Sequence, residues 1–169
     1  MSKEFDILLF ATKDKIFRFA LKMLDHNYEE ARDIVQDVFE KLWKMKNELP
    51  QYGNLEALSV KITKNLCLDR LKHERIKSQK LNIIQDTGGQ LNNMDNYDEK
   101  NTCEIIKELI GRLPEKQRMI IHLRDVEGFE LNEIADIMEM NIEAVRMNLS
   151  RGRTTIKEKL IKTMDHGLR

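Results

Sequence analysis

Residues 131–160, LNEIADIMEMNIEAVRMNLSRGRTTIKEKL, place apolar residues at helical spacing in two groups that are separated by a short break. Ile134, Ala135 and Met138 predict the inward side of a short helix. The second group predicts the inward side of a longer helix and consists of Val145, Leu149, Ile156 and Leu160. Asn141 stands just before this longer helix, where its side chain can accept an early backbone N–H. A short helix, a tight turn and a longer helix form the helix-turn-helix pattern.

The outward side of the longer helix is rich in groups that recognise DNA. In helix-turn-helix proteins the second helix lies in the major groove, and its early outward residues contact base edges. Arginine can bind guanine and asparagine can bind adenine, whereas the basic residues that follow suit phosphates. The outward candidates are Arg146, Met147, Asn148, Ser150 and Arg151. A plain helical hairpin has a similar shape, so the pattern alone leaves both interpretations open.

Helical spacing continues over almost the whole chain, and the alternation typical of strands is hard to find. Asn27 with Glu30, and Asn101 with Glu104, match the N-x-x-E capping pattern at which helices begin. The sequence therefore predicts an all-α protein. The expected helices span about residues 3–24, 27–46, 55–79, 101–113, 114–126, 131–138 and 142–164.

A polar segment divides these helices into two groups. Residues 82–101 contain five Asn, a Gly-Gly pair, and four acids against one Lys, with too few apolar residues to bury a helix face. This composition predicts a flexible polar linker. We therefore expect two small helical domains, residues 1–81 and 102–169, with the helix-turn-helix in the second.

The formal net charge of the chain is zero, but the charge is unevenly distributed. Residues 60–80 hold seven basic residues against two acids, and residues 144–163 hold six against one, so each stretch carries +5. Two separate basic stretches suggest two contacts with a polyanion, although a single stretch of this kind is more often a solvated helix face.

Composition excludes several classes of protein. With 169 residues, 41% of them hydrophobic, the chain has no apolar run long enough to cross a bilayer, and the apolar patch near its start is too short for a signal peptide. We expect a cytoplasmic protein whose two cysteines, Cys67 and Cys103, are reduced. No P-loop, Rossmann glycine pattern, GxSxG or HExxH motif is present, and the four histidines are scattered. We therefore expect no enzymatic activity, no cofactor, no metal and no small-molecule substrate.

Residues 113–160 resemble region 4 of the sigma-70 family, and specifically the extracytoplasmic-function (ECF) sigma factors. The matching residues are Leu113-Pro114, Gln117-Arg118, Glu127-Gly128, Glu133-Ile134-Ala135, Val145-Arg146, Leu149-Ser150-Arg151 and Arg153. The resemblance implies that the helix-turn-helix reads the promoter −35 element, and it adds Asn141 and Arg153 to the candidate DNA-binding residues. Two positions depart from the family. Glu139 replaces a common turn glycine, so the turn must avoid a positive φ or carry strain there, and Asn148 replaces a frequent Arg.

Residues 29–44, EEARDIVQDVFEKLWK, look like region 2 of the same family. Helical spacing puts apolar residues on one side of this segment and a polar stripe on the other, which by spacing alone would be a solvated face. The resemblance implies instead that the stripe docks on the clamp helices of the RNA polymerase largest subunit. The residues assigned to this surface are Asp33, Gln36, Asp37 and Glu40.

Residues 57–75, ALSVKITKNLCLDRLKHER, resemble the promoter −10 segment of region 2 through Asn65-Leu66, Leu68-Asp69 and Leu71-Lys72. In that family this segment opens DNA and captures a base of the non-template strand. We expect its cations to point outward toward phosphates and its Asn to reach a base edge. The candidates are Lys61, Lys64, Asn65, Arg70, Lys72, His73 and Arg75.

The combined interpretation is an ECF-type sigma factor that binds bacterial core RNA polymerase and recognises the −10 and −35 elements of promoter DNA. The resemblance also implies an anti-sigma factor, often a membrane protein, as a partner. Two alternatives stay open at this stage. One is a helix-turn-helix regulator that binds DNA as a dimer without polymerase. The other is a helical protein-interaction module with no role on DNA.

Overall fold

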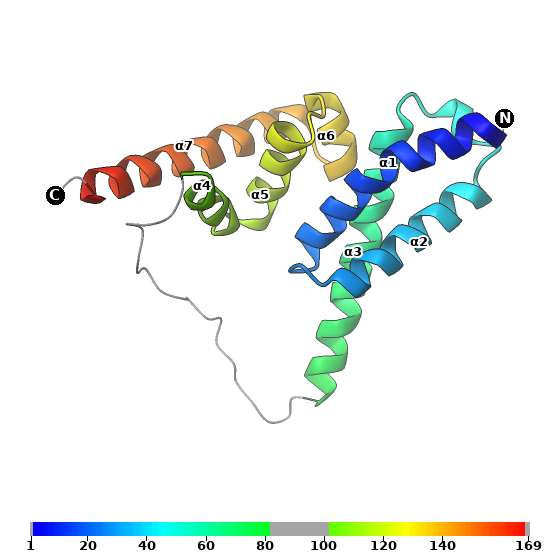
Figure 1. The fold of residues 1–169 in the computed structure, drawn as a ribbon, viewed down its shortest axis with the longest axis horizontal. Coiled ribbons are helices and arrows are strands. Elements are labelled where there is room, and N and C mark those ends of the chain that lie inside the picture. The colour runs from blue at the N-terminus through cyan, green and yellow to red at the C-terminus, as the bar shows by residue number, and fades with distance from the viewer. Residues whose placement is uncertain (1, 82–101, 168–169) are drawn as a thin grey trace. The chain divides into compact units, whose positions relative to one another are not determined.

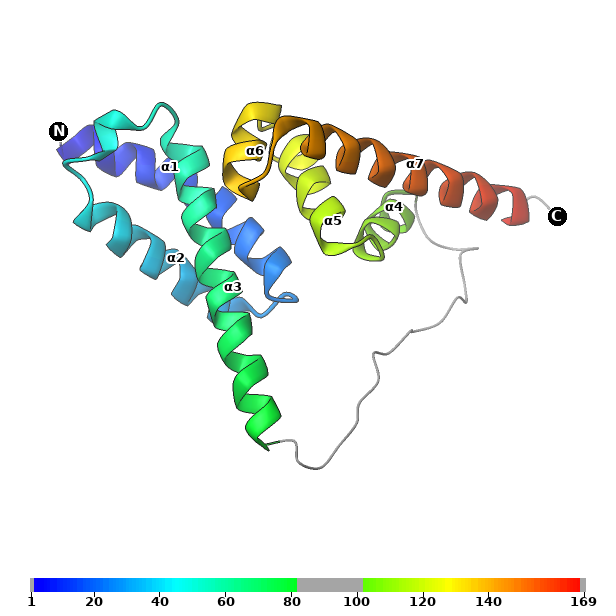
Figure 2. The same ribbon diagram turned by 180° about the vertical axis from the view of Figure 1, so that it is seen from behind.

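The computed structural model describes residues 2–81 and 102–167, and within these residues the chain is helical without strands. The predicted linker, residues 82–101, lies outside the described residues. Helices α1 to α3 form one compact unit and helices α4 to α7 form a second (Figures 1 and 2). The predicted all-α class with two helical units is confirmed. None of the helices described is long and apolar enough to cross a membrane.

The first unit is a three-helix assembly. Helix α1 (Ser2–Met23) and helix α2 (Tyr28–Lys44) are joined by a short turn, and α3 (Leu55–Leu81) packs against both after a single 3-10 turn (Leu49–Gln51). Its core includes Ile16, Ala20, Leu24, Ala31, Ile34, Val35, Val38, Leu42, Leu49 and Cys67. Burial of these side chains provides the main driving force that holds the three helices together.

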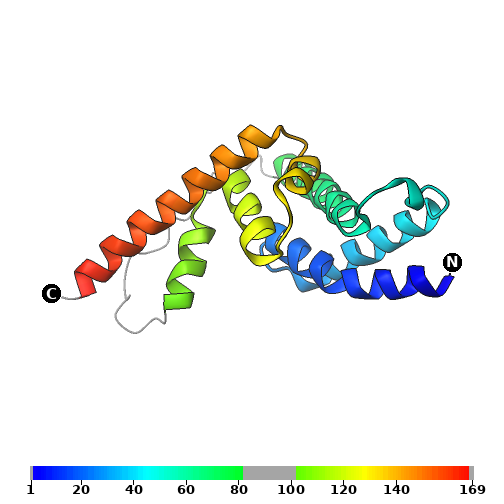
Figure 3. The same cartoon turned by 90° about the horizontal axis from the view of Figure 1, so that it is seen from above.

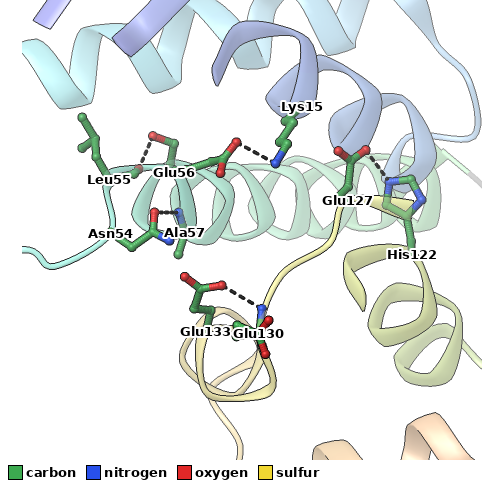
Figure 4. A network of polar contacts seen from close by, with 10 residues as sticks. Lys15, Asn54, Leu55, Glu56, Ala57, His122, Glu127, Glu130 and Glu133 are labelled. Carbon is green, nitrogen blue, oxygen red and sulfur yellow. Dashed lines mark hydrogen bonds and ion pairs between the residues drawn. The ribbon is translucent and has the colours of Figure 1, made fainter. Parts of the chain in front are cut away.

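Two asparagines fix where helices of this unit begin. The Oδ1 atom of Asn27 accepts the backbone N–H of Glu30 at 3.3 Å, so the predicted N-cap of α2 is confirmed. Asn54 caps α3 in the same way, accepting the N–H of Ala57 at 3.1 Å (Figure 4). Each cap satisfies a backbone N–H at the start of its helix that has no partner within the helix.

The second unit is built on one long helix. Helices α4 (Thr102–Gly111), α5 (Glu115–Ile121) and α6 (Leu131–Met138) all pack against α7 (Ile142–Gly167), as Figure 3 shows from above. A π-helical turn (His122–Val126) continues α5, and Gly128 follows it with φ +79°. The helix expected over residues 114–126 therefore ends in a π turn, at the glycine that the sequence indicates.

Close packing between α5 and α7 depends on a glycine. A Cβ atom at Gly152 would lie 2.6 Å from Cδ1 of Ile121, which is itself buried. The buried interior of the unit includes Leu109, Ile120, Leu123, Ile134, Ile137, Val145 and Leu149. Ile134, Val145 and Leu149 are inward as predicted. Ala135 and Met138 are half-buried, and Ile137 is the fully buried residue of α6 that the spacing analysis did not single out.

Candidate functional sites

Helix α2 presents the polar stripe that was assigned to polymerase binding. Asp33, Gln36 and Glu40 are exposed and Asp37 is half-buried, while the apolar side of the same helix is buried in the core. Glu40 accepts a hydrogen bond from Lys44 at 2.5 Å, one helical turn later, and this contact lowers the pKa of the Glu40 carboxyl. The stripe therefore offers an amide and three carboxylates to solvent, a set that can pair with basic side chains of a partner.

Arg70 of α3 lies between two carboxylates of this stripe. Its two terminal nitrogens are each 3.7 Å from an Oδ2 atom, one of Asp33 and the other of Asp37. The Arg70 side chain is 30% exposed, so its guanidinium is directed toward α2 and only partly toward solvent. Arg70, which the sequence predicts to contact promoter DNA, thus forms ion pairs with Asp33 and Asp37, which the sequence predicts to bind polymerase.

Four of the other −10 candidates are exposed on α3 as predicted, namely Asn65, Lys72, His73 and Arg75, whereas Lys61 is half-buried. Asn65 and Lys72 are seven residues apart and so lie on one side of the helix. This side carries an amide and a cation, which are groups of the kind that bind bases and phosphates.

The prediction that Lys64 points outward is wrong. Its residue is 4% exposed, because α-helical spacing places it one turn from Val60 and one turn from Cys67, both of which are buried. The outward assignment of Arg70 also needs correction, since its guanidinium faces the acids of α2. Both errors arise because a count of charges along a window does not consider the helix face on which each charge lies.

Helix α7 is the second helix of the helix-turn-helix. Asn141 caps it, with Oδ1 accepting the N–H of Ala144 at 2.7 Å, so the predicted N-cap is confirmed. Four of the candidates are exposed on its N-terminal half, namely Arg146, Met147, Ser150 and Arg151. Helical spacing places Met147, Ser150 and Arg151 on the side opposite buried Val145 and Leu149.

The remaining two −35 candidates make contacts within the protein. The Nδ2 atom of Asn148 donates to the carbonyl of Ala144 at 2.8 Å. Arg153 donates through Nε to Oδ2 of Asp125 at 3.1 Å and through a second nitrogen to Oδ1 of the same carboxylate. This bidentate contact raises the pKa of Arg153. Sequence analysis missed Asp125, because nothing local indicates a partner so far along the chain.

The turn between α6 and α7 resolves the question raised by Glu139. This residue has φ 55° and ψ 47°, so it adopts the left-handed conformation that a glycine would occupy without strain. The N–H of Met140 donates to the carbonyl of Ala135 at 3.1 Å and closes the end of α6. Of the two possibilities, the turn therefore adopts the positive φ and carries the strain.

Polar contacts also fix the segment before α6 (Figure 4). The backbone N–H of Glu130 donates to Oε2 of Glu133 at 2.8 Å, which fixes the start of that helix. In the preceding π turn, Nε2 of His122 lies 3.4 Å from Oε1 of buried Glu127, and the Glu127 N–H donates to the His122 carbonyl at 3.0 Å. These contacts position the first helix of the helix-turn-helix.

Comparisons with known proteins match both units. Residues 9–76 match Sigma-70 region 2 and residues 103–156 match Sigma-70, region 4. The chain is 25% identical over 170 residues to the ECF RNA polymerase sigma-E factor of Escherichia coli K12, covering 94% of this chain and 87% of that protein. It is 27% identical over 153 residues to the ECF RNA polymerase sigma factor SigE of Mycolicibacterium smegmatis, covering 88% of this chain and 58% of that longer relative.

A solved structure has the same fold. It is that of the sigma factor RpoE in complex with the anti-sigma factor NepR from Bartonella quintana, with a TM-score of 0.74, 22% sequence identity, and coverage of 95% of this chain and 98% of that one. A DNA-binding regulator that acts without polymerase is not favoured, because it would not account for the region 2 match over the first unit. The chain belongs to the sigma-70 family, in its extracytoplasmic-function group of RNA polymerase sigma factors.

Proposed function

We propose that the first unit binds bacterial core RNA polymerase through α2 and promoter −10 DNA through α3, and that the second unit binds the −35 element through α7. The observation that carries the proposal is the exposure of the α2 stripe, Asp33, Gln36, Asp37 and Glu40, on a unit that matches region 2. Acidic and amide groups of this kind can pair with the basic residues of a partner and fix its orientation.

On the DNA side, the contact set that we propose is narrower than the one expected from the sequence. For the −10 element it comprises Lys61, Asn65, Lys72, His73 and Arg75, and for the −35 element Arg146, Met147, Ser150 and Arg151. Three residues are left out of the −35 set. Asn141 caps α7, and Asn148 and Arg153 would have to break their hydrogen bonds within the protein before they could contact DNA. Residues 1–81 and 102–169 are proposed as the two functional domains, with residues 82–101 as the linker.

The partners follow from this assignment. Catalysis of RNA synthesis resides in the polymerase, and the chain acts in the cytoplasm as a binding and positioning factor without a cofactor. An anti-sigma factor is a further proposed partner, supported by the relative of similar fold that is bound to one.

The test is binding of the labelled chain to bacterial core polymerase in competition with an unlabelled housekeeping sigma factor. We expect saturable, competed binding that Asp37→Lys weakens by at least about tenfold, because reversal of one interface charge replaces attraction by repulsion. Transcription from a promoter template should then be lost in Arg151→Glu while binding to core is retained. Absence of binding by the folded wild-type chain would reject the proposal and favour a regulator that acts without polymerase.

A further inference from the structure

Arg70 lies inside the surface that we assign to polymerase, although it belongs to the helix assigned to DNA. Its two terminal nitrogens are shared between Asp33 and Asp37, each at 3.7 Å. At this distance the contacts are electrostatic and not hydrogen bonds. The two acid side chains remain 64% and 47% exposed, whereas the Arg70 side chain is 30% exposed. The two carboxylates are thus accessible to a partner, whereas the guanidinium of Arg70 that interacts with them is less exposed.

A further acid, Glu30, also interacts with Arg70, and Glu74 in turn interacts with Glu30. The pKa of Glu30 is raised overall. Burial is the largest cause, followed by a side-chain hydrogen bond and like charge from Glu74, whereas the positive charge of Arg70 acts in the opposite direction. Asp33 adds to the negative potential at Glu30. Arg70 therefore interacts with three carboxylates of α2, namely Glu30, Asp33 and Asp37, and its single positive charge offsets only part of theirs.

A cationic partner that approaches Asp33 and Asp37 meets this guanidinium as a competitor. Arg70 screens the charge of both acids and repels a second cation that comes within a few ångströms. Asp33 and Asp37 are four residues apart on α2, where two like charges repel each other, so Arg70 also relieves repulsion in the free protein. The same residue therefore favours the free state and opposes the bound state.

We propose that Arg70 is an internal counter-ion that lowers the affinity of the α2 acid surface for its cationic partner, and that it does so through Asp33 and Asp37. The inference rests on the proposed function, since polymerase is the partner concerned. It assigns to Arg70 a role in setting affinity in place of the DNA contact that the basic stretch suggested. A partner must supply cations placed well enough to outcompete Arg70, which favours a matched surface over a diffuse polycation.

The experiment measures the affinity of the full chain for bacterial core polymerase at low salt. Arg70→Met removes the charge and keeps an aliphatic side chain that can pack in the half-buried position. We expect about two- to fivefold tighter binding, the range of an exposed ion pair. In the background of Asp33→Asn with Asp37→Asn, the same Arg70 change should have no effect. Lys15→Met is the matched control, because it removes another cation of the same unit, one that lies 2.8 Å from Glu56.

Each outcome decides one point. Unchanged or weaker binding of Arg70→Met, or a gain that persists without the two aspartates, overturns the inference and leaves the proposed function intact. A similar gain in Lys15→Met also overturns it, because the effect would then be one of net charge. If no variant binds core polymerase, both the inference and the proposed function fail. Circular dichroism checks folding, and Arg70→Gln replaces Arg70→Met if the latter is unfolded.

Discussion

Arg153 of α7 and Asp125 of the π turn form a bidentate ion pair across 28 residues of sequence. The Arg153 side chain is 54% exposed and that of Asp125 is 35% exposed, so the pair lies at the surface. A guanidinium held in this way is directed back toward its own unit. Among the basic residues of α7, Arg153 thus differs from Arg151, which is exposed on the outward side.

We predict that these two arginines differ in their effect on DNA binding. Arg151→Gln should flatten the slope of log affinity against log salt by up to about one unit, because one phosphate contact is lost. Arg153→Gln should flatten this slope clearly less than Arg151→Gln does, because Asp125 already neutralises the charge of Arg153 in the free protein. The measurement is promoter binding by the polymerase complex at several salt concentrations. Asp125→Asn is the control and should steepen the slope by releasing Arg153, and equal flattening by both arginine changes would contradict the prediction.

The two cysteines should differ sharply in reactivity. Cys67 is fully buried, and burial raises the pKa of its thiol to about 12, so almost no thiolate exists at neutral pH. Cys103 is exposed. Titration of the native chain with a disulfide reagent at pH 8 should show one fast thiol, and a second only after addition of denaturant. Cys103→Ser should abolish the fast reaction, whereas rapid labelling of Cys67 in that variant would show that the first unit opens readily.

The sequence was sufficient for the approximate positions of the helices and for the caps at Asn27 and Asn141, because apolar periodicity and these caps are local features. The cap at Asn54 was not predicted, and the one expected at Asn101 lies outside the described residues. It was insufficient for the contacts of Arg70, because the position of that guanidinium depends on how α3 packs against α2. The burial of Lys64 differs in kind, since it follows from helical spacing to Val60 and Cys67. The Asp125 pair depends on contacts between distant segments and has no local signal.

The contact between Glu30 and Glu74 predicts a pH-dependent stability. The pKa of Glu30 is raised above its ordinary 4.5, mainly by burial and then by Glu74, so the ionised carboxyl is disfavoured in the folded protein. The penalty is fully present above the raised pKa and disappears below 4.5. Glu74→Gln should therefore increase the free energy of unfolding at pH 7, by less than about 1 kcal/mol for an exposed pair, and should have little effect near pH 4.

Chemical unfolding at pH 7, 5.5 and 4 provides this measurement. Glu29→Gln is the matched control, because it removes a charge from the same turn of α2, and it should not show the same pH-dependent gain. A wild-type chain that is more stable than Glu74→Gln at pH 7 would show that Arg70 outweighs the repulsion between the two glutamates.

The strained turn at Glu139 offers a test of the helix-turn-helix geometry. Its φ of 55° costs an L-residue about 1 kcal/mol or more, whereas glycine adopts this conformation freely. Glycine also gives the unfolded chain more freedom to lose, which offsets part of the gain. Glu139→Gly should therefore raise the free energy of unfolding of the second unit by roughly 0.5 kcal/mol.

Two other variants separate backbone strain from the contribution of the Glu139 side chain. Glu139→Ala removes that side chain but keeps the strain, so it should be no more stable than the wild type. Gly128→Ala should change the free energy of unfolding in the opposite direction to Glu139→Gly. We expect it to lower that free energy by about 1 kcal/mol, because it introduces strain at φ +79°. Thermal unfolding of the full chain, followed by circular dichroism, measures all three. A Glu139→Gly variant that is less stable than Glu139→Ala would show that the turn does not hold a left-handed residue in solution.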